Sequence, residues 1–162
     1  MQDIISRMRA KKQDEGFTLI ELLVVVVIIG VLVAIAVPVY LNYRQGAADK
    51  SAQSDVRGAV SAVEQWYTDN ANTYPATKTV QSTSFSLDTP VSTTNQVTLS
   101  DNTRMVYVLT ASAGTAGSYK ICATNTGGTG KVYVYDSSKG GSVKATTTAT
   151  PDVTNCTNLA TA

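Results

Sequence analysis

The feature that most constrains this chain is an apolar run of 22 residues, from Leu22 to Tyr43, that carries no charge. As an α-helix this run would be about 33 Å long, because each helical residue adds about 1.5 Å. That length matches the hydrocarbon core of a bilayer, which is about 30 Å thick. The run therefore predicts a helix that lies in a membrane or in an equally apolar protein interior.

The segment before this run is basic and has no apolar stretch: residues 1–16 carry four bases and three acids. A secretory signal peptide has a cleavage site of small residues behind its apolar region. No such site follows this run, since Pro38 stands just behind Ala34 and Ala36. A cut after Gly16 would instead remove only the leader and keep the apolar run. The alternative is an uncleaved membrane anchor with its positive flank in the cytoplasm.

Residues 16–21, Gly-Phe-Thr-Leu-Ile-Glu, resemble the prepilin-peptidase motif of type IV pilins and of the related pseudopilins of type II secretion. The resemblance implies that the bond between Gly16 and Phe17 is cleaved and that the new amine of Phe17 is methylated. It extends to Gly30 and Pro38, which match a helix-weakening glycine and proline of that family. It covers residues 7–43 strongly and the remainder only in general layout.

Glu21 is the only charged side chain between Phe17 and Tyr43. A carboxylate within a transmembrane helix costs about 2.5–3.5 kcal/mol on insertion scales, so a partner is expected. Cleavage would supply the Phe17 amine, four residues away on the same helical face. The resemblance implies that Glu21 pairs with the Phe17 amine of a neighbouring subunit and sets the axial register of a filament. The alternative is that Glu21 lies at shallow depth and reaches the lipid headgroups.

Gly30 and Pro38 are unusual residues for a helix interior, where glycine costs about 1 kcal/mol and proline about 3 kcal/mol relative to alanine. Pro38 has no N–H for the carbonyl of Ala34. Transmembrane helices tolerate both residues, so a bend near Pro38 is expected. The resemblance implies, further, that the segment from Gly30 to Pro38 can unwind when subunits pack.

Beyond the apolar run the helical pattern continues over residues 44–72 and becomes amphipathic. One side carries small apolar residues at spacings of three and four, namely Ala48, Ala52, Val56, Ala59, Val60, Val63 and Tyr67. The opposite side is expected to face solvent and carries Gln45, Asp49, Gln53, Arg57, Ser61, Glu64 and Thr68. Trp66 is assigned to the core. The helix should end at residues 69–72, ahead of Tyr74 and Pro75.

The remainder is expected to form a small antiparallel sheet packed on the amphipathic helix, which gives an α+β fold. Residues 73–100 are rich in Thr and Ser and are predicted to form a connecting loop with at most one short strand. Within residues 101–162, strands are predicted at 104–110, 118–124 and 131–135, with Tyr119, Ile121 and Ala123 on one face of the second. The tail from residue 145 would be loose without a covalent tie.

Cys122 and Cys156 are the only cysteines, and the chain has no histidine, which argues against a zinc site. In an oxidising compartment the two should pair. Closing a loop of about 35 residues would stabilise the fold by about 3–4 kcal/mol in the chain-entropy model. Two unpaired thiols are the alternative. A disulfide here resembles the C-terminal region of many pilins, whereas major pseudopilins often lack one.

Catalysis finds little support, because a chain without histidine cannot build Ser-His-Asp or Cys-His arrangements. Residues 127–130 look like a hairpin turn rather than a phosphate-binding loop. The spacing of Asp69, Asn70, Asp88 and Asp101 matches no calcium loop. Residues 17–162 carry nine bases and nine acids, so no strong field for nucleic acid is expected. We predict no enzymatic activity, no cofactor and no metal.

The sequence therefore predicts a structural subunit of a type IV pilus. The resemblance implies a precursor in the cytoplasmic membrane with its head outside, prepilin peptidase as its processing enzyme, and an assembly platform with an ATPase. The product would be a helical homopolymer of this chain, used in adhesion, motility or DNA uptake. Two alternatives stay open: a pseudopilin of a type II secretion system, and a single-pass anchored binding domain that never assembles.

Overall fold

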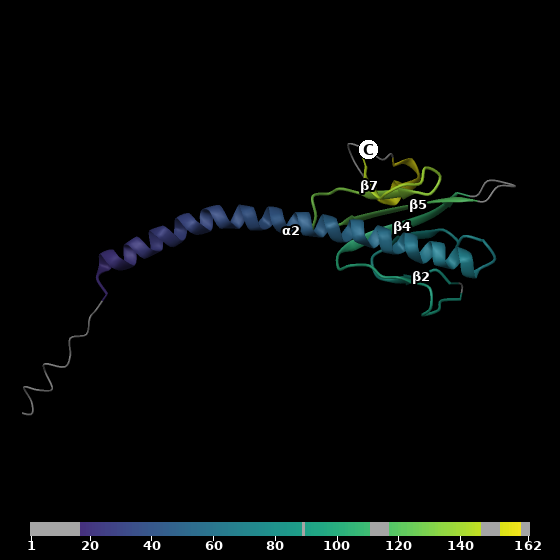
Figure 1. Ribbon diagram of the computed structural model, residues 1–162. Coiled ribbons are helices and arrows are strands. Elements are labelled where there is room, and N and C mark those ends of the chain that lie inside the picture. The colour runs from purple at the N-terminus through teal and green to yellow at the C-terminus, as the bar shows by residue number, and fades with distance from the viewer. Residues whose placement is uncertain (1–16, 89, 111–116, 147–152, 160–162) are drawn as a thin grey trace, which may run out of the picture. The chain divides into compact units, whose positions relative to one another are not determined.

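The computed structural model describes residues 17–88, 90–110, 117–146 and 153–159 (Figure 1). The chain divides into two compact units, Met1–Tyr40 and Leu41–Ala162. The described elements, in chain order, are α2 (Leu19–Asp69), β1 (Lys78–Gln81), β2 (Phe85–Ser86), β3 (Gln96–Val97), β4 (Thr103–Thr110), β5 (Ser118–Asn125), β6 (Tyr133–Asp136), β7 (Lys144–Ala145) and the 3-10 helix η1 (Val153–Asn158). A long N-terminal helix, an antiparallel sheet and a disulfide-bonded C-terminal region confirm the predicted α+β class.

Helix α2 ends close to where the sequence predicts. Its last residue is Asp69, and Ala71 and Asn72 then adopt positive φ angles of 51° and 59°. The Asn72 N–H donates to the Tyr67 carbonyl at 3.0 Å, which satisfies one of the carbonyls left free at a helix C-terminus. The left-handed turn redirects the chain toward the sheet.

The main sheet has five strands in the order β1-β4-β5-β6-β7, and each neighbouring pair is antiparallel. Strands β4 and β5 pair over their whole length, from Thr103 opposite Asn125 to Thr110 opposite Ser118. The second predicted strand pairs in this way at the centre of the sheet. Strands β2 and β3 form a separate two-stranded sheet.

The expectation for residues 73–100 needs correction. This range holds three short strands, and β1 is an edge strand of the main sheet. Its pairing places Lys78 opposite Tyr107 and Gln81 opposite Met105, with an irregularity between them. The sequence of β1, Lys-Thr-Val-Gln, has one apolar residue, and its order depends on the partner strand rather than on its own composition. In the same way, β6 begins at Tyr133 rather than at 131.

The main core lies between the sheet and α2. Four of the small residues predicted on the apolar side of α2 are buried, namely Ala52, Val56, Ala59 and Val63. They pack with Met105, Tyr107, Tyr119, Ile121 and Ala123, so the predicted face of β5 is confirmed. Trp66 is partly buried against this core, as predicted. The spacing of three and four residues thus correctly identified the helix face that meets the sheet.

A second core covers the opposite face of the sheet. There Val106, Cys122, Val132 and Val134 pack with Val153 and Cys156 of η1 and with Leu159, which follows η1. Strand β5 is therefore buried on both faces. The C-terminal region, expected to be loose apart from the disulfide, is an ordered layer over residues 153–159.

Asp49 is a second correction, because it is predicted on the solvent side of α2 and is 5% exposed. Its Oδ1 accepts a hydrogen bond from the Thr129 N–H at 2.9 Å, and its Oδ2 accepts one from Thr129 Oγ1 at 2.6 Å. A Cβ at Gly128 would collide with this carboxylate. The turn between β5 and β6 thus closes over Asp49, and a glycine at 128 permits that approach.

Candidate processing and assembly site

The start of α2 is closed by a reciprocal cap between Thr18 and Glu21. Glu21 Oε2 accepts hydrogen bonds from the Thr18 N–H and from Thr18 Oγ1, both at 2.8 Å. The Glu21 N–H donates to Thr18 Oγ1 at 3.3 Å. This is a capping box, in which each side chain satisfies a backbone donor of the first helical turn. Its signal, threonine followed three residues later by glutamate, stands in the sequence, and sequence reasoning missed it.

The structure places the predicted site residues along α2 as follows. Phe17 precedes the helix and is 88% exposed, whereas Glu21, Gly30 and Pro38 lie within it. Gly16, the predicted cleavage residue, lies outside the described residues. Glu21 is paired with Thr18 in the single chain. Its expected pairing with the Phe17 amine of a neighbouring subunit stays a prediction.

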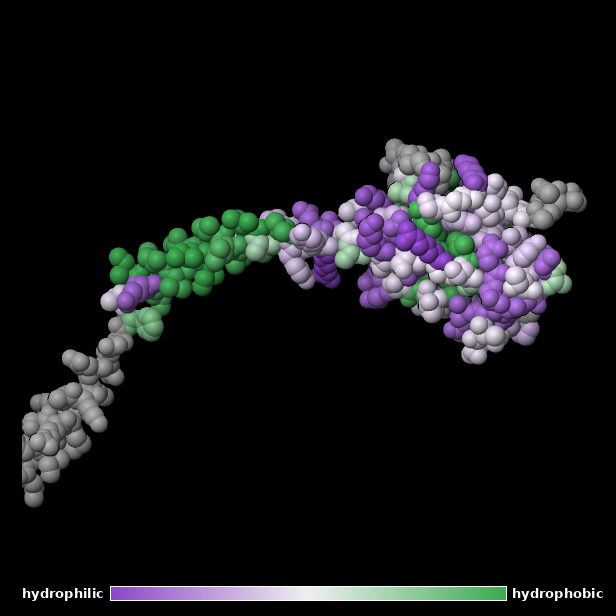
Figure 2. Space-filling view, viewed as in Figure 1, coloured by the Kyte–Doolittle hydropathy of each residue, from purple (hydrophilic) through white to green (hydrophobic). Residues whose placement is uncertain are grey.

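Around this cap, the N-terminal segment presents a continuous apolar surface. Every large apolar side chain from Phe17 to Tyr43 is at least 48% exposed. Figure 2 shows most of this segment as a continuous green surface on the face in view, with a purple patch near its N-terminal end. Helix α2 is long and apolar enough to cross a membrane. An exposed apolar patch of this extent marks a surface for lipid or for another protein.

Gly30 and Pro38 interrupt neither the assignment nor the continuity of α2. A Cβ at Gly30 would meet no atom within 4 Å, so nothing in the described chain requires glycine there. Pro38 lies inside the helix, where it removes one backbone donor. The expected unwinding between these residues, and the bend near Pro38, stay predictions.

In the second unit, polar contacts join α2 to two loops and to strand β5. Besides the contact of Asp49 with Thr129, Asp55 accepts hydrogen bonds from Ser100, at 2.9 Å from the N–H and 2.8 Å from Oγ. Tyr119 Oη donates to Glu64 Oε1 at 2.5 Å. These three pairings join residues at least 45 positions apart in sequence. No local sequence pattern predicts these pairings.

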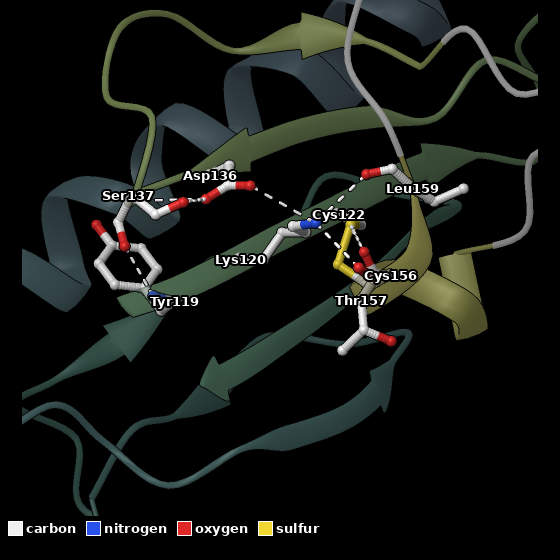
Figure 3. Close-up of polar contacts among 9 residues, drawn as sticks. Tyr119, Lys120, Cys122, Asp136, Ser137, Cys156, Thr157 and Leu159 are labelled. Carbon is white, nitrogen blue, oxygen red and sulfur yellow. Dashed lines mark hydrogen bonds and ion pairs between the residues drawn. A yellow bond between two sulfur atoms is a disulfide. The ribbon is translucent and has the colours of Figure 1, made fainter. Parts of the chain in front are cut away.

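The disulfide expected from the cysteine count is present. Cys122 of β5 and Cys156 of η1 are bonded, with Cα atoms 5.7 Å apart, and both residues are buried. Beside the disulfide, Lys120 extends from β5 toward the end of η1 (Figure 3). The staple is thus accompanied by a second, polar connection, which the sequence did not indicate.

The described residues contain no cluster of three or more His, Cys, Asp or Glu side chains suited to a metal ion. The carboxylates that come close to other elements are instead occupied by hydroxyl and backbone donors, as for Asp49 and Asp55.

Comparison with known proteins finds a family motif over the segment that contains Phe17, Thr18 and Glu21. Residues 11–37 match the family described as the prokaryotic N-terminal methylation motif. This motif and the relatives described below support a place for the chain in the superfamily of type IV pilins and type II secretion pseudopilins. Members of that superfamily are structural subunits.

Its relatives carry two kinds of name. The type II secretion system core protein G of Escherichia coli is 40% identical over 70 residues, which are 43% of this chain and 48% of that protein. The fimbrial protein EcpC of Eikenella corrodens is 42% identical over 59 residues, 36% of this chain and 39% of the relative. A fimbrial protein of Neisseria meningitidis serogroup A is 38% identical over 75 residues, 46% and 44% of the two chains.

The matched segment thus spans about half the length of the curated relatives or less. No solved structure matches the chain. The similarity does not choose between a pilus subunit and a secretion pseudopilin, because both names occur among relatives of comparable identity.

Proposed function

We propose that this chain is a structural subunit of a type IV pilus, assembled through its N-terminal helix. The observation that carries the proposal is the exposed apolar surface of residues 17–43 with Glu21 near its start. A bundle of such helices would bury this surface against copies of itself. The methylation motif over residues 11–37 supports the same conclusion.

The proposal gives each part of the chain a task. Residues 1–16 are a basic leader that prepilin peptidase removes after Gly16, and Phe17 becomes the methylated N-terminus. Residues 17–43 hold the precursor in the cytoplasmic membrane and later form the filament core. Residues 44–162 form a head outside the membrane that becomes the filament surface. An assembly platform and its ATPase supply the energy.

In this proposal Glu21 sets the register between subunits. In the single chain its carboxylate is satisfied by Thr18, which lowers the cost of placing it in a membrane. On assembly, the Phe17 amine of a neighbour would offer a charged partner, and a charge-assisted contact is stronger than one between neutral groups. The exchange of partners would favour one axial position of the incoming subunit.

A pseudopilin is the second candidate, because relatives named type II secretion system core protein G match the same segment. The two candidates share the processing site and the apolar helix. The disulfide between Cys122 and Cys156 favours a pilin by resemblance to that family. A filament that is shed from cells by shearing would support a pilus, and a need for the chain in exoprotein release would support a pseudopilin.

The first experiment is to shear cells, collect extracellular filaments and measure the intact mass of this protein. We expect a chain that begins at methylated Phe17 and is two hydrogens lighter than the reduced form. The full chain, found only in membranes with residues 1–16 attached, would contradict the proposal and favour an anchored domain. A processed chain absent from sheared material would favour the pseudopilin.

The second experiment separates the two roles of Glu21. Glu21→Ala should leave processing and membrane insertion intact and abolish filaments, because the carboxylate is lost. Thr18→Ala removes the hydroxyl of the cap but keeps the carboxylate, so filaments should persist. Asp69→Ala, at an exposed carboxylate of the same helix, is the control. Normal filaments from Glu21→Ala would refute the register role, and equal loss from Thr18→Ala would assign the effect to the cap.

A further inference from the structure

The Lys120 ammonium group joins three segments of the head. Its Nζ donates to the carbonyl oxygens of Thr157 at 3.0 Å and of Leu159 at 3.3 Å. It also forms an ion pair with Asp136 Oδ2 at 3.6 Å. An ammonium group has three N–H donors; two of them serve these carbonyls, and Asp136 balances the positive charge. Figure 3 shows Lys120 between the strand that carries Asp136 and the end of η1.

Asp136 is itself held in place for this contact. Its Oδ1 accepts hydrogen bonds from the Ser138 N–H at 3.1 Å and from Ser138 Oγ at 2.6 Å, which leaves Oδ2 toward Lys120. The side chains of Lys120 and Asp136 are only 17% and 15% exposed. A lysine this enclosed loses rotamer freedom, so an ordered environment must offset that cost. The three contacts form a built arrangement rather than a chance approach of surface charges.

The segment that Lys120 holds is weak on its own. Helix η1 has six residues and a break at Asn155, and such short 3-10 segments are not stable in isolation. The side chains of Val153 and Cys156, together with that of Leu159 just after η1, pack it against the sheet. Lys120 adds a cap at its C-terminal end, where helix carbonyls lack intrahelical partners. In sequence, Cys156 lies between Val153, which packs on the sheet, and the Thr157 carbonyl, which accepts from Lys120.

We propose that Lys120 is a positioning residue for the disulfide: in the reduced chain it docks η1 on the sheet and brings the Cys156 thiol to Cys122, so that oxidation joins two cysteines of one chain. The competing product is a disulfide between two copies. Cys122 and Cys156 are separated by 34 positions, so closing the loop between them costs entropy, and chain connectivity alone does not hold the two thiols together. A docked η1 raises the effective concentration of one thiol at the other. This inference does not depend on the proposed filament.

The oxidation itself is ordinary thiol–disulfide exchange. With glutathione disulfide as oxidant, one cysteine thiolate attacks it, forms a mixed disulfide and releases one glutathione thiolate. The second cysteine thiolate then attacks the mixed disulfide and releases the other glutathione. Two cysteine thiols are oxidised, one glutathione disulfide is reduced to two thiols, and the protons pass to solvent and the leaving thiolates. Lys120 acts on the second step, where the thiol of the same chain competes with other copies.

The test uses the full chain in detergent micelles, reduced and then equilibrated in buffers of oxidised and reduced glutathione. Samples are quenched by alkylation, and mass spectrometry and non-reducing gels give the fractions of intramolecular disulfide, mixed disulfide and dimer. Lys120→Met should lower the effective concentration of the cysteine pair at least tenfold and increase the dimer fraction. Lys131→Met, at an exposed lysine before β6, should match the unchanged chain.

Two further variants distinguish positioning from general stability. Ser100→Ala removes a hydrogen bond to Asp55 on the helix side of the sheet, away from η1. An equal fall in effective concentration for Ser100→Ala and Lys120→Met would overturn the proposal, as would no change for Lys120→Met. If Lys120→Met does not fold by near-ultraviolet circular dichroism, Asp136→Asn replaces it. That variant removes the charge opposite Lys120 and should lower the effective concentration severalfold, and wild-type behaviour would again refute the proposal.

Discussion

At the scale of single residues, two buried carboxylates of α2 bind the loops that pack against this helix. Asp49 and Asp55 are 5% and 9% exposed, and each accepts one backbone and one hydroxyl hydrogen bond from a loop. Hydrogen bonds to a charged group are worth about 1.5–3 kcal/mol each, more than those between neutral groups. Thr129 and Ser100 lie outside the strands, so these contacts fix the turn and the loop that pack against α2.

Asp49→Ala should destabilise the head by about 1–3 kcal/mol, because the Thr129 N–H and hydroxyl lose their acceptor in a half-buried site. Urea unfolding of the full chain in micelles, followed by tryptophan fluorescence, measures the change. Asp69→Ala is the matched control: Asp69 is exposed and accepts only from Gln65, so its loss should stay within about 0.5 kcal/mol. Equal effects of the two substitutions would mean that the hydrogen bonds between Asp49 and Thr129 contribute nothing to the stability of the head.

At the scale of elements, α2 and β5 meet through a cluster of tyrosines. Tyr119 has ring centroids of Tyr74, Tyr107 and Tyr135 at 5.0, 5.6 and 5.7 Å, and Tyr74 stacks on Tyr67 at 4.4 Å. Burial raises the pKa of Tyr107 and of Tyr119. The pKa of Tyr119 is raised further by its hydrogen bond to Glu64.

These shifts predict that the head loses stability in alkali. An unfolded tyrosine has a pKa of about 10, and the pKa of Tyr119 is higher in the folded chain. The unfolded state therefore releases its proton first, so this contribution is fully present below pH of about 10 and falls as the pH rises further. Unfolding free energies measured in urea from pH 9 upward should decline, and the decline should be shallower in Tyr119→Phe. The same slope in both proteins would contradict the prediction.

The elements also show what sequence reasoning could reach. The apolar run of α2, its amphipathic continuation and strands β4 and β5 follow from periodic patterns within a few residues. Strand β1 could not be found this way, because Lys78 to Gln81 are ordered by pairing with β4. Asp49 was misplaced for a related reason: its burial depends on the turn at Thr129, 80 positions away.

The site divides along the same line. Phe17, Glu21, Gly30 and Pro38 are predicted as site residues by resemblance to a family motif, and these roles stay predictions. The disulfide is predicted by the cysteine count and is present. The spacing of Thr18 and Glu21 is that of a capping box, so the sequence contains the signal for this cap, although it was not among the predictions. Lys120 was not readable at all, since its three partners lie on β6 and at the end of η1, and only the folded sheet brings them together.

At the scale of the whole molecule, the contacts described for the head all lie in one of the two compact units. Every residue from 17 to 47 is exposed, and the first buried residue of α2 is Asp49. Both cores, the disulfide and the Lys120 contacts belong to the unit Leu41–Ala162. The contacts described above that stabilise the head therefore lie within this one unit.

This separation predicts that residues 41–162 alone form a soluble, monomeric head. The shortened chain should contain the Cys122–Cys156 disulfide, and its free energy of unfolding in urea should agree with that of the full chain in micelles within about 0.5 kcal/mol, because both cores and the disulfide lie within residues 41–162. Light scattering measures the mass, and alkylation with mass spectrometry measures the disulfide. The full chain should aggregate when detergent is removed, since its apolar helix surface is then exposed to water. A shortened chain that fails to fold, or unfolds at a much lower midpoint, would show that residues before Leu41 contribute to the head.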